Sequence, residues 1–299
     1  MKPERVVQPR FSIAFRFNGL ALAIPIAALT LWLDARPSRR PAPAAIVTGR
    51  ADAVRLPSGD ARAWRLAADD PRFGGLSALA FDEGKLLALT DSGVVVRFAP
   101  PRPGSQALQF ALRDLPAGPG SPQRKSARDS ESLLRDPRGR GWWVGFETVH
   151  SLWLFDRHFD RALERRRLDV DWPANKGSEA LVALGDAVAA LPEMGGRAAG
   201  ARLDAPLWTA DATRLPDGRL VVLTRAITIR GFDNQLRIAA GAGKPARRIM
   251  LKVGMLDNLE GMAAAPLPGG GTRLWIVGDN NFRPWMRTLL VALDLPAGA

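Results

Sequence analysis

The sequence predicts an all-β protein, and the favoured architecture is a β-propeller of about six blades. Beyond Ala51 no long stretch shows the apolar periodicity of a helix. Short apolar runs are instead separated by Gly, Asp and Pro, as expected of strands joined by turns. Equivalent runs recur at spacings of about 35–55 residues, the range of a propeller blade. A two-sheet sandwich is the alternative, because hairpins alone do not distinguish the two folds.

Five hairpins are expected along the chain. The first joins Lys85–Thr90 to Val94–Phe98 through the turn Asp91-Ser92-Gly93. The others pair Trp142–Phe146 with Ser151–Phe155, Ala180–Leu184 with Ala187–Leu191, Arg219–Thr224 with Ala226–Arg230, and Leu274–Val277 with Thr288–Leu293. The segment Pro100–Arg128 is rich in Pro, Gly and Ser, and it is expected to form a long surface excursion between blades.

The N-terminal region has the pattern of an export signal. Basic residues precede the apolar run Phe17–Leu33, so residues 1–33 are expected to form a helical signal peptide or a membrane anchor. Residues 34–50 are expected to be a linker, and residues 51–299 the folded domain. The expected location is periplasmic or otherwise extracytoplasmic, with residues 17–33 anchoring the chain to the inner membrane if they are retained.

Composition excludes several functional classes. The absence of cysteine excludes a disulfide scaffold, a zinc ribbon and a cysteine nucleophile, and two histidines exclude a histidine-rich metal site. No G-x-S-x-G, Walker or dinucleotide-binding motif occurs. The net charge of +12 comes largely from arginines spread along loops, which favours a solvated surface or a small anionic or ester substrate over nucleic acid. A monomer is expected.

Acidic residues fall beside short apolar runs throughout the chain. A single Asp at such a place is explained by turn preference, but Glu has no such preference and recurs there. Carboxylates gathered around one channel would repel each other unless a cation neutralises them, and hard oxygen ligands favour Ca²⁺. The expected metal ligands are Asp91, Glu131, Glu147, Glu179, Glu193, Glu260 and Asp279.

Eight short motifs together resemble the phytase-like family described as "esterase-like activity of phytase". They occur in the family's order within residues 73–79, 91–93, 129–133, 145–147, 175–181, 191–193, 257–262 and 279–290. The resemblance implies a propeller-like fold, export from the cytoplasm and hydrolase activity. Two positions depart from the family's pattern, because Thr224 and Asn280 stand where an acidic residue is common.

The resulting hypothesis is an exported hydrolase that cleaves phosphate or other esters with the help of Ca²⁺. The expected catalytic residues are Glu131, Asp257 and Glu260. Substrate binding is expected at Arg225, Arg230, Asn258 and Asn281, or at Arg283 and Arg287. Two alternatives are a membrane-tethered, non-catalytic propeller with a structural calcium site, and a sugar-lactone hydrolase on a similar propeller.

Overall fold

The computed structural model describes residues 41–57, 59, 61–122, 127–241 and 243–297. The expected signal or anchor helix and residues 34–40 of the expected linker lie outside these residues. In the described part of the chain, every regular element is a strand, and no helix has the length and apolar character needed to cross a membrane. The all-β prediction is confirmed.

Twenty-one strands succeed one another along the described chain. They are β1 (Ala45–Val54), β2 (Arg62–Ala68), β3 (Leu76–Asp82), β4 (Lys85–Thr90), β5 (Val94–Phe98), β6 (Gln106–Asp114), β7 (Ser130–Arg135), β8 (Gly141–Phe146), β9 (Ser151–Asp156), β10 (Ala162–Arg167), β11 (Ser178–Leu184), β12 (Ala187–Pro192), β13 (Gly196–Arg197), β14 (Asp204–Ala205), β15 (Thr209–Arg214), β16 (Leu220–Thr228), β17 (Gly231–Ile238), β18 (Arg247–Leu251), β19 (Asn258–Pro266), β20 (Thr272–Asp279) and β21 (Thr288–Leu295).

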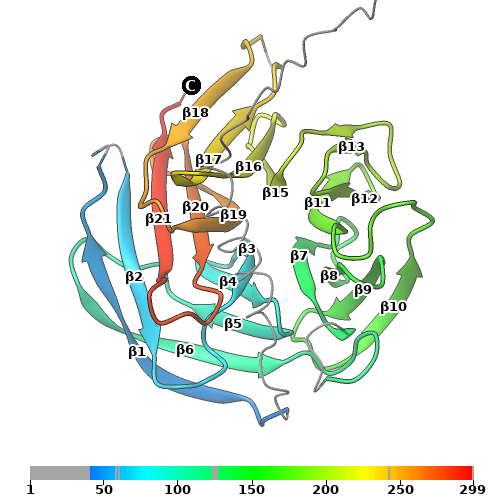
Figure 1. Ribbon diagram of the computed structural model, residues 1–299, viewed down its shortest axis with the longest axis horizontal. Coiled ribbons are helices and arrows are strands. Elements are labelled where there is room, and N and C mark those ends of the chain that lie inside the picture. Colours follow the sequence, from blue (N-terminus) through cyan, green and yellow to red (C-terminus); the bar gives the residue numbers. More distant parts are fainter. Residues whose placement is uncertain (1–40, 58, 60, 123–126, 242, 298–299) are drawn as a thin grey trace, which may run out of the picture. The chain divides into compact units, whose positions relative to one another are not determined.

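The strands are arranged as antiparallel groups around a central ring (Figure 1). The innermost strands are β3, β7, β11, β15 and β19, and each contacts the next, with β19 returning to β3. From each inner strand the chain runs outward through antiparallel neighbours, as in β7-β8-β9-β10 and β15-β16-β17-β18. This radial arrangement is that of a propeller. The described residues contain five such groups, so the expected number of about six blades is not confirmed.

The first and last groups are fused into one nine-stranded sheet. Strand β1 pairs with β6 on one side and with β2 on the other, and β2 pairs with β21. The two ends of this sheet, β3 and β19, also contact each other, so the sheet is nearly closed on itself. Its interior is filled by a large apolar cluster in which Trp64 lies against Trp275 and Phe98 against Phe110. Burial of this cluster stabilises the sheet in its closed form.

Three sequence expectations need correction. Strand β16 continues through Arg225 to Thr228, so the expected turn between Arg219–Thr224 and Ala226–Arg230 is wrong. The segment Pro100–Arg128 contains β6, which pairs with β1 and β5, and is therefore only partly a surface excursion. Strand β1 begins at Ala45, so the last residues of the expected linker 34–50 belong to the fold. The other hairpins pair as expected.

Candidate active site

The same irregularity occurs near the start of every inner strand. In each inner strand the pairing with the second strand skips one residue, as it does between Ser130 and Ser132 in β7 and between Leu259 and Gly261 in β19. A β-bulge of this kind re-aims a side chain and often lies next to an active site. The residues at the five skipped positions, here called the bulge residues, are Ser77, Glu131, Glu179, Ala210 and Glu260.

A second set of positions lies beside the bulges, within each second strand or directly after it. The residue before each bulge pairs with a second-strand residue, as Ser130 does with Phe146, and the next residue of that strand then lies beside the bulge. These residues, here called the flanking residues, are Asp91, Glu147, Glu193, Arg225 and Asp279. Because both sets lie at the same end of the ring, the fold gathers acidic residues that are far apart in sequence.

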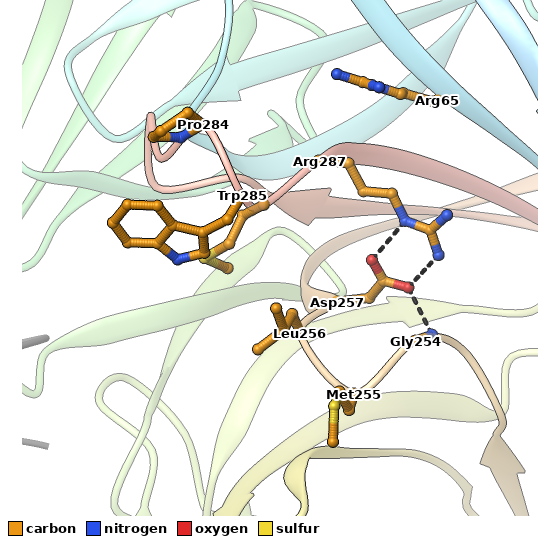
Figure 2. Close-up of a pocket in the computed structure, with 9 residues that line it drawn as sticks. Arg65, Gly254, Met255, Leu256, Asp257, Pro284, Trp285 and Arg287 are labelled. Carbon is orange, nitrogen blue, oxygen red and sulfur yellow. Dashed lines mark hydrogen bonds and ion pairs between the residues drawn. The ribbon is translucent and has the colours of Figure 1, made fainter. Parts of the chain in front are cut away.

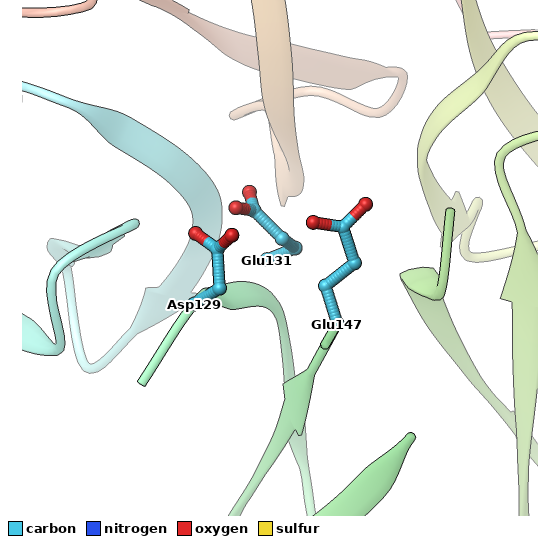
Figure 3. Close-up of side chains that lie close together, drawn as sticks. All are labelled: Asp129, Glu131 and Glu147. Atoms are coloured by element: carbon cyan, nitrogen blue, oxygen red, sulfur yellow. The ribbon is translucent and has the colours of Figure 1, made fainter. Parts of the chain in front are cut away.

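The carboxylates of neighbouring blades form a cluster at this end. Oxygens of Asp129, Glu131 and Glu147 lie within 4.8 Å of one another, as do those of Glu147, Glu179 and Glu193. Figure 3 shows the first three side chains directing their carboxylates into the same space. Glu147, Glu179 and Glu193 are buried, while Asp129 and Glu131 keep some contact with solvent.

Close packing of these acids disfavours their charged forms. Burial, followed by repulsion from Asp129 and Glu193, raises the pKa of Glu147 to about 8. A hydrogen bond between the carboxyl groups of Asp129 and Glu147 acts in the same direction on this pKa. Burial and neighbouring carboxylates also raise the pKa of Glu131 and the pKa of Glu179 well above the ordinary value. The cluster is therefore stabilised either by protonation of its carboxylates or by a bound cation.

Two basic side chains neutralise one side of the cluster. Arg225 donates hydrogen bonds to Glu260 and to Asn258 Oδ1, the latter at 2.8 Å, and its Nη2 lies 3.5 Å from Glu193 Oε1. Lys176 Nζ lies 2.5 Å from Glu193 Oε2. Although burial lowers the pKa of Arg225, the carboxylates of Glu260 and Glu179 raise it above its ordinary value. Arg225 is therefore a permanent cation inside the cluster.

The remaining side of the cluster fits a hard divalent cation. Asp129, Glu131, Glu147 and Glu179 come from two neighbouring blades and offer carboxylate oxygens only. Such oxygens are the ligands that Ca²⁺ prefers, and a cation among them would relieve the repulsion that raises their pKa values. The chemistry of this donor set thus matches the Ca²⁺ expected from the sequence.

Not every expected metal ligand joins the two carboxylate groups. Asp91 and Asp279 are buried flanking residues of the fused sheet, but neither belongs to the groups of described acids whose oxygens approach within 4.8 Å. The backbone carbonyl of Asp91 accepts a hydrogen bond from Ser130 N at 3.4 Å. Asp279 Oδ1 accepts one from Asn281 N at 2.6 Å. The roles of both as ligands remain predictions.

The expected substrate-binding residues have different surroundings. Asn258 is buried and donates to Glu260 Oε1 at 2.5 Å, so it helps to hold that carboxylate. Asn281 has a positive φ of 47° in the β20–β21 loop and is partly exposed. Arg230 is exposed at the tip of the β16–β17 hairpin. Their contacts with a substrate remain predictions.

Asp257, expected to be catalytic, lies in a separate pocket (Figure 2). Its oxygens accept hydrogen bonds from Arg287 Nε at 2.8 Å and Nη2 at 2.6 Å, and from Gly254 N at 2.6 Å. The pocket has a volume of about 340 Å³, and Leu256 and Trp285 also line it. A buried carboxylate held in this way fixes the loops around it, and Asp257 does not belong to either carboxylate group of the described residues.

Asp129 and Lys176 belong to the cluster but are absent from the residues expected from the sequence. Both lie one or two residues before an inner strand, within the motifs around Glu131 and Glu179. The carboxylate of Asp129 meets that of Glu147, and its position two residues before Glu131 is the sequence signal that could have indicated it. The approach of Lys176 to Glu193 depends on the fold and has no such signal.

Comparison with solved structures gives several distant matches. The catalytic domain of Coprinopsis cinerea GH62 alpha-L-arabinofuranosidase is 12% identical, covers 84% of this chain and 99% of its own, and has a TM-score of 0.45. The Cps50 (Swd1) β-propeller domain of Myceliophteria thermophila is 12% identical over 74% and 97%, with a TM-score of 0.40. A putative 6-phosphogluconolactonase from Bacteroides uniformis is 15% identical over 82% and 84%, with a TM-score of 0.36. Because these TM-scores are below 0.5, the fold assignment rests on the strand order itself.

A family model gives the more specific match. No curated protein matches the chain in sequence. The model described as "Phytase-like: Esterase-like activity of phytase" matches residues 71–210. This segment includes β3 to β14 and contains Asp129, Glu131, Glu147, Glu179 and Glu193. The resemblance to the phytase-like family that the sequence motifs indicate is therefore confirmed over residues 71–210.

Proposed function

We propose that the protein is a hydrolase that cleaves phosphate esters or other esters with the help of a divalent cation, most simply Ca²⁺. The observation that carries this proposal is the convergence of Asp129, Glu131, Glu147 and Glu179, of which the three glutamates have a raised pKa. The match to the phytase-like family model supports hydrolysis as the reaction class. Export from the cytoplasm is part of the same proposal.

The bound cation would neutralise an anionic substrate and polarise its phosphoryl or carbonyl oxygen. Glu131 and Glu147 are placed to exchange a proton with a water or a leaving oxygen, since both direct their carboxylates into the shared space (Figure 3). Arg225 holds the carboxylate of Glu260 in place. Glu260, expected to be catalytic, is thus better suited to be a positioning residue.

The direct test is hydrolysis by the full chain on phosphomonoesters, phytate, carboxylic esters and lactones, with Ca²⁺ and with chelator. We expect release from one class of substrate, loss of release in chelator, and a loss of at least about 100-fold in Glu131→Gln. The matched control is Glu164→Gln, which changes an ion pair on the outer strand β10 and should retain activity. Hydrolysis that is unchanged in Glu131→Gln would refute the proposed site.

A second candidate is a binding protein with a structural cation. It is favoured by the internal ion pairs of Arg225 and Lys176, which satisfy Glu193 and Glu260 without any substrate. Thermal stabilisation by Ca²⁺ with no release from any class of ester would select this candidate. Release from lactones alone would select the lactone hydrolase.

A further inference from the structure

Exposed apolar side chains are concentrated on the end of the ring that carries the carboxylates. In an antiparallel blade, the loops before the first strand and after the second strand lie at one end, which is the end of the bulge and flanking residues. Of the eleven large apolar residues that are exposed in the described chain, seven lie in these loops and an eighth, Ile227, lies one residue before the end of β16. They are Val149, Met194, Leu207, Ile227, Ile229, Met255, Leu256 and Trp285.

Five of these residues lie on adjoining loops and are here called the apolar corner: Ile227, Ile229, Met255, Leu256 and Trp285. The β16–β17 hairpin touches the β18–β19 loop, because Phe232 N donates to Met255 O at 2.9 Å. Met255, Leu256 and Trp285 line one pocket together (Figure 2). Ile229 is 97% exposed and Trp285 61% exposed, so the corner presents its side chains outward.

Basic residues surround the apolar corner. Arg230 is exposed next to Ile229, and Lys252 is exposed three residues before Met255. The Arg283 guanidinium lies 5.6 Å from the ring centre of Trp285. Aliphatic and aromatic side chains with a basic border are typical of a surface that enters the headgroup region of an anionic bilayer. A second copy of the chain would instead bring these cations together.

Acidic residues are scarce around the corner. Asp257 is buried against Arg287, which leaves Asp233 as an exposed acid next to the hairpin tip. The charge of the border is therefore positive, and it complements an anionic surface rather than a zwitterionic one.

The described chain also begins at this end of the ring. Ala42 N donates to Asp114 Oδ2 at 2.8 Å, and Arg72 Nη1 donates to Pro43 O at 2.9 Å. Asp114 ends β6 and Arg72 precedes β3, so both lie at the end that carries the carboxylates.

We propose that the apolar corner docks on an anionic lipid bilayer, so that the end of the ring with the carboxylates faces the membrane. Docking is independent of the expected anchor, because it depends on Ile227, Ile229 and Trp285 together with Arg230 and Lys252. Docking also does not require the carboxylate cluster, because none of these residues belongs to it; Arg230 is in addition an expected substrate-binding residue. The proposal therefore adds a membrane-binding surface to the candidate active site.

The chain has no cysteine, so single cysteines can report the position of each end of the ring. Ile229→Cys and, at the opposite end, Asp186→Cys in the β11–β12 turn are introduced separately into the full chain and labelled with a nitroxide. Each labelled protein is reconstituted into vesicles of anionic or of zwitterionic phospholipid. The accessibility of the nitroxide to oxygen, which enters lipid, and to a water-soluble nickel chelate is then measured by electron paramagnetic resonance.

In anionic vesicles we expect the label at 229 to be accessible to oxygen and protected from nickel, while the label at 186 remains accessible to nickel. Adding Arg230→Glu and Lys252→Glu to the Ile229→Cys chain should lower its docked fraction roughly tenfold. Equal nickel accessibility at both positions would overturn the proposal. Protection of position 229 that is the same without lipid would also overturn it, because a protein contact would then cover the corner. Glu131→Gln should leave the docking signal unchanged whether or not the protein hydrolyses esters.

Discussion

Arg225 distinguishes its blade from the neighbouring ones. The blades that begin with β7 and β11 place Glu147 and Glu193 at the flanking position, whereas the blade that begins with β15 places a guanidinium there. Its partners Glu193 and Glu260 are largely buried, and removing one partner of a buried ion pair leaves an uncompensated charge. The residue therefore stabilises the cluster and limits the room for cations on its side.

Replacing Arg225 should reveal this dependence. We expect Arg225→Met to lower the free energy of unfolding by about 3–5 kcal/mol in chelator, because Glu193 and Glu260 lose a cation. Added Ca²⁺ should restore part of the loss, whereas it should restore little in Arg62→Met, whose partner Asp294 is exposed. Chemical denaturation with and without Ca²⁺ measures both effects. Equal stability of Arg225→Met and the natural protein would contradict this role.

The raised pKa of Glu147 predicts how stability depends on pH without metal. Folding raises this pKa from 4.5 to about 8, so the folded protein keeps a proton that the unfolded chain loses within this window. The free energy of unfolding in chelator should therefore fall as pH rises from about 5 to about 8. Thermal unfolding across this range measures the slope. Glu147→Gln should flatten it, and a slope that Glu147→Gln leaves unchanged would assign the effect to other groups.

Strands β3 and β19 approach each other too closely for a larger side chain between them. A Cβ on Gly261 of β19 would lie 2.7 Å from the Ala78 carbonyl carbon of β3. This contact joins the two ends of the nine-stranded sheet. The glycine after the bulge residue Glu260 is thus required by the approach of two backbones.

Replacing Gly261 should therefore lower the stability of the protein through a steric clash, and not only through the loss of glycine's backbone freedom. We expect Gly261→Ala to lower the free energy of unfolding by at least about 2 kcal/mol through overpacking. The control Gly185→Ala has a φ of +59° and nothing within 4 Å of its Cβ, so its cost should stay near the roughly 1 kcal/mol of a left-handed residue. Urea denaturation compares the two. A smaller loss in Gly261→Ala than in Gly185→Ala would contradict the close approach.

Local sequence patterns are sufficient to predict some elements and not others. The Asp91-Ser92-Gly93 turn between two apolar runs identifies β4 and β5 correctly. Strand β6 escapes prediction because it lies within a segment rich in proline and glycine, although its exposed and buried residues alternate as in a half-buried strand. Strand β16 is divided at Arg225 in the sequence prediction because a charge inside an apolar run resembles a turn, whereas the guanidinium is directed to Glu260.

The site is predictable only in its residue types. Carboxylates beside apolar runs indicate Glu131, Glu147, Glu179 and Glu193, and the structure brings these four into the cluster. Their proximity depends on β-bulges, which arise in the pairing of two strands, and on contacts between blades. Neither feature has a local sequence signature. The same reason explains why Arg225 and Lys176 are not predictable as partners of Glu193.

Strand β1 connects the first and last blades of the molecule. Ala51 is fully buried between β2 and β6, while Ile46 on the same strand is 73% exposed. We expect Ala51→Asp to lower the free energy of unfolding by more than about 4 kcal/mol, because it buries an unpaired charge in the fused sheet. Ile46→Asp should change it by less than about 0.5 kcal/mol. An equally small effect of both changes in thermal unfolding would show that β1 is dispensable.

The pairing of β2 with β21 has a consequence for how the chain acquires its structure. Arg62 of β2 pairs with Ala292 of β21. Of the two strands that close the ring, β2 is therefore synthesised early and β21 last. Contacts between such distant residues carry a large loop-closure entropy and form slowly. The edge of β2 that pairs with β21 therefore remains unpaired until synthesis and any export of the last blade are complete. A chain that loses its final strand should remain open and accessible to proteases and chaperones, however well its middle blades have formed.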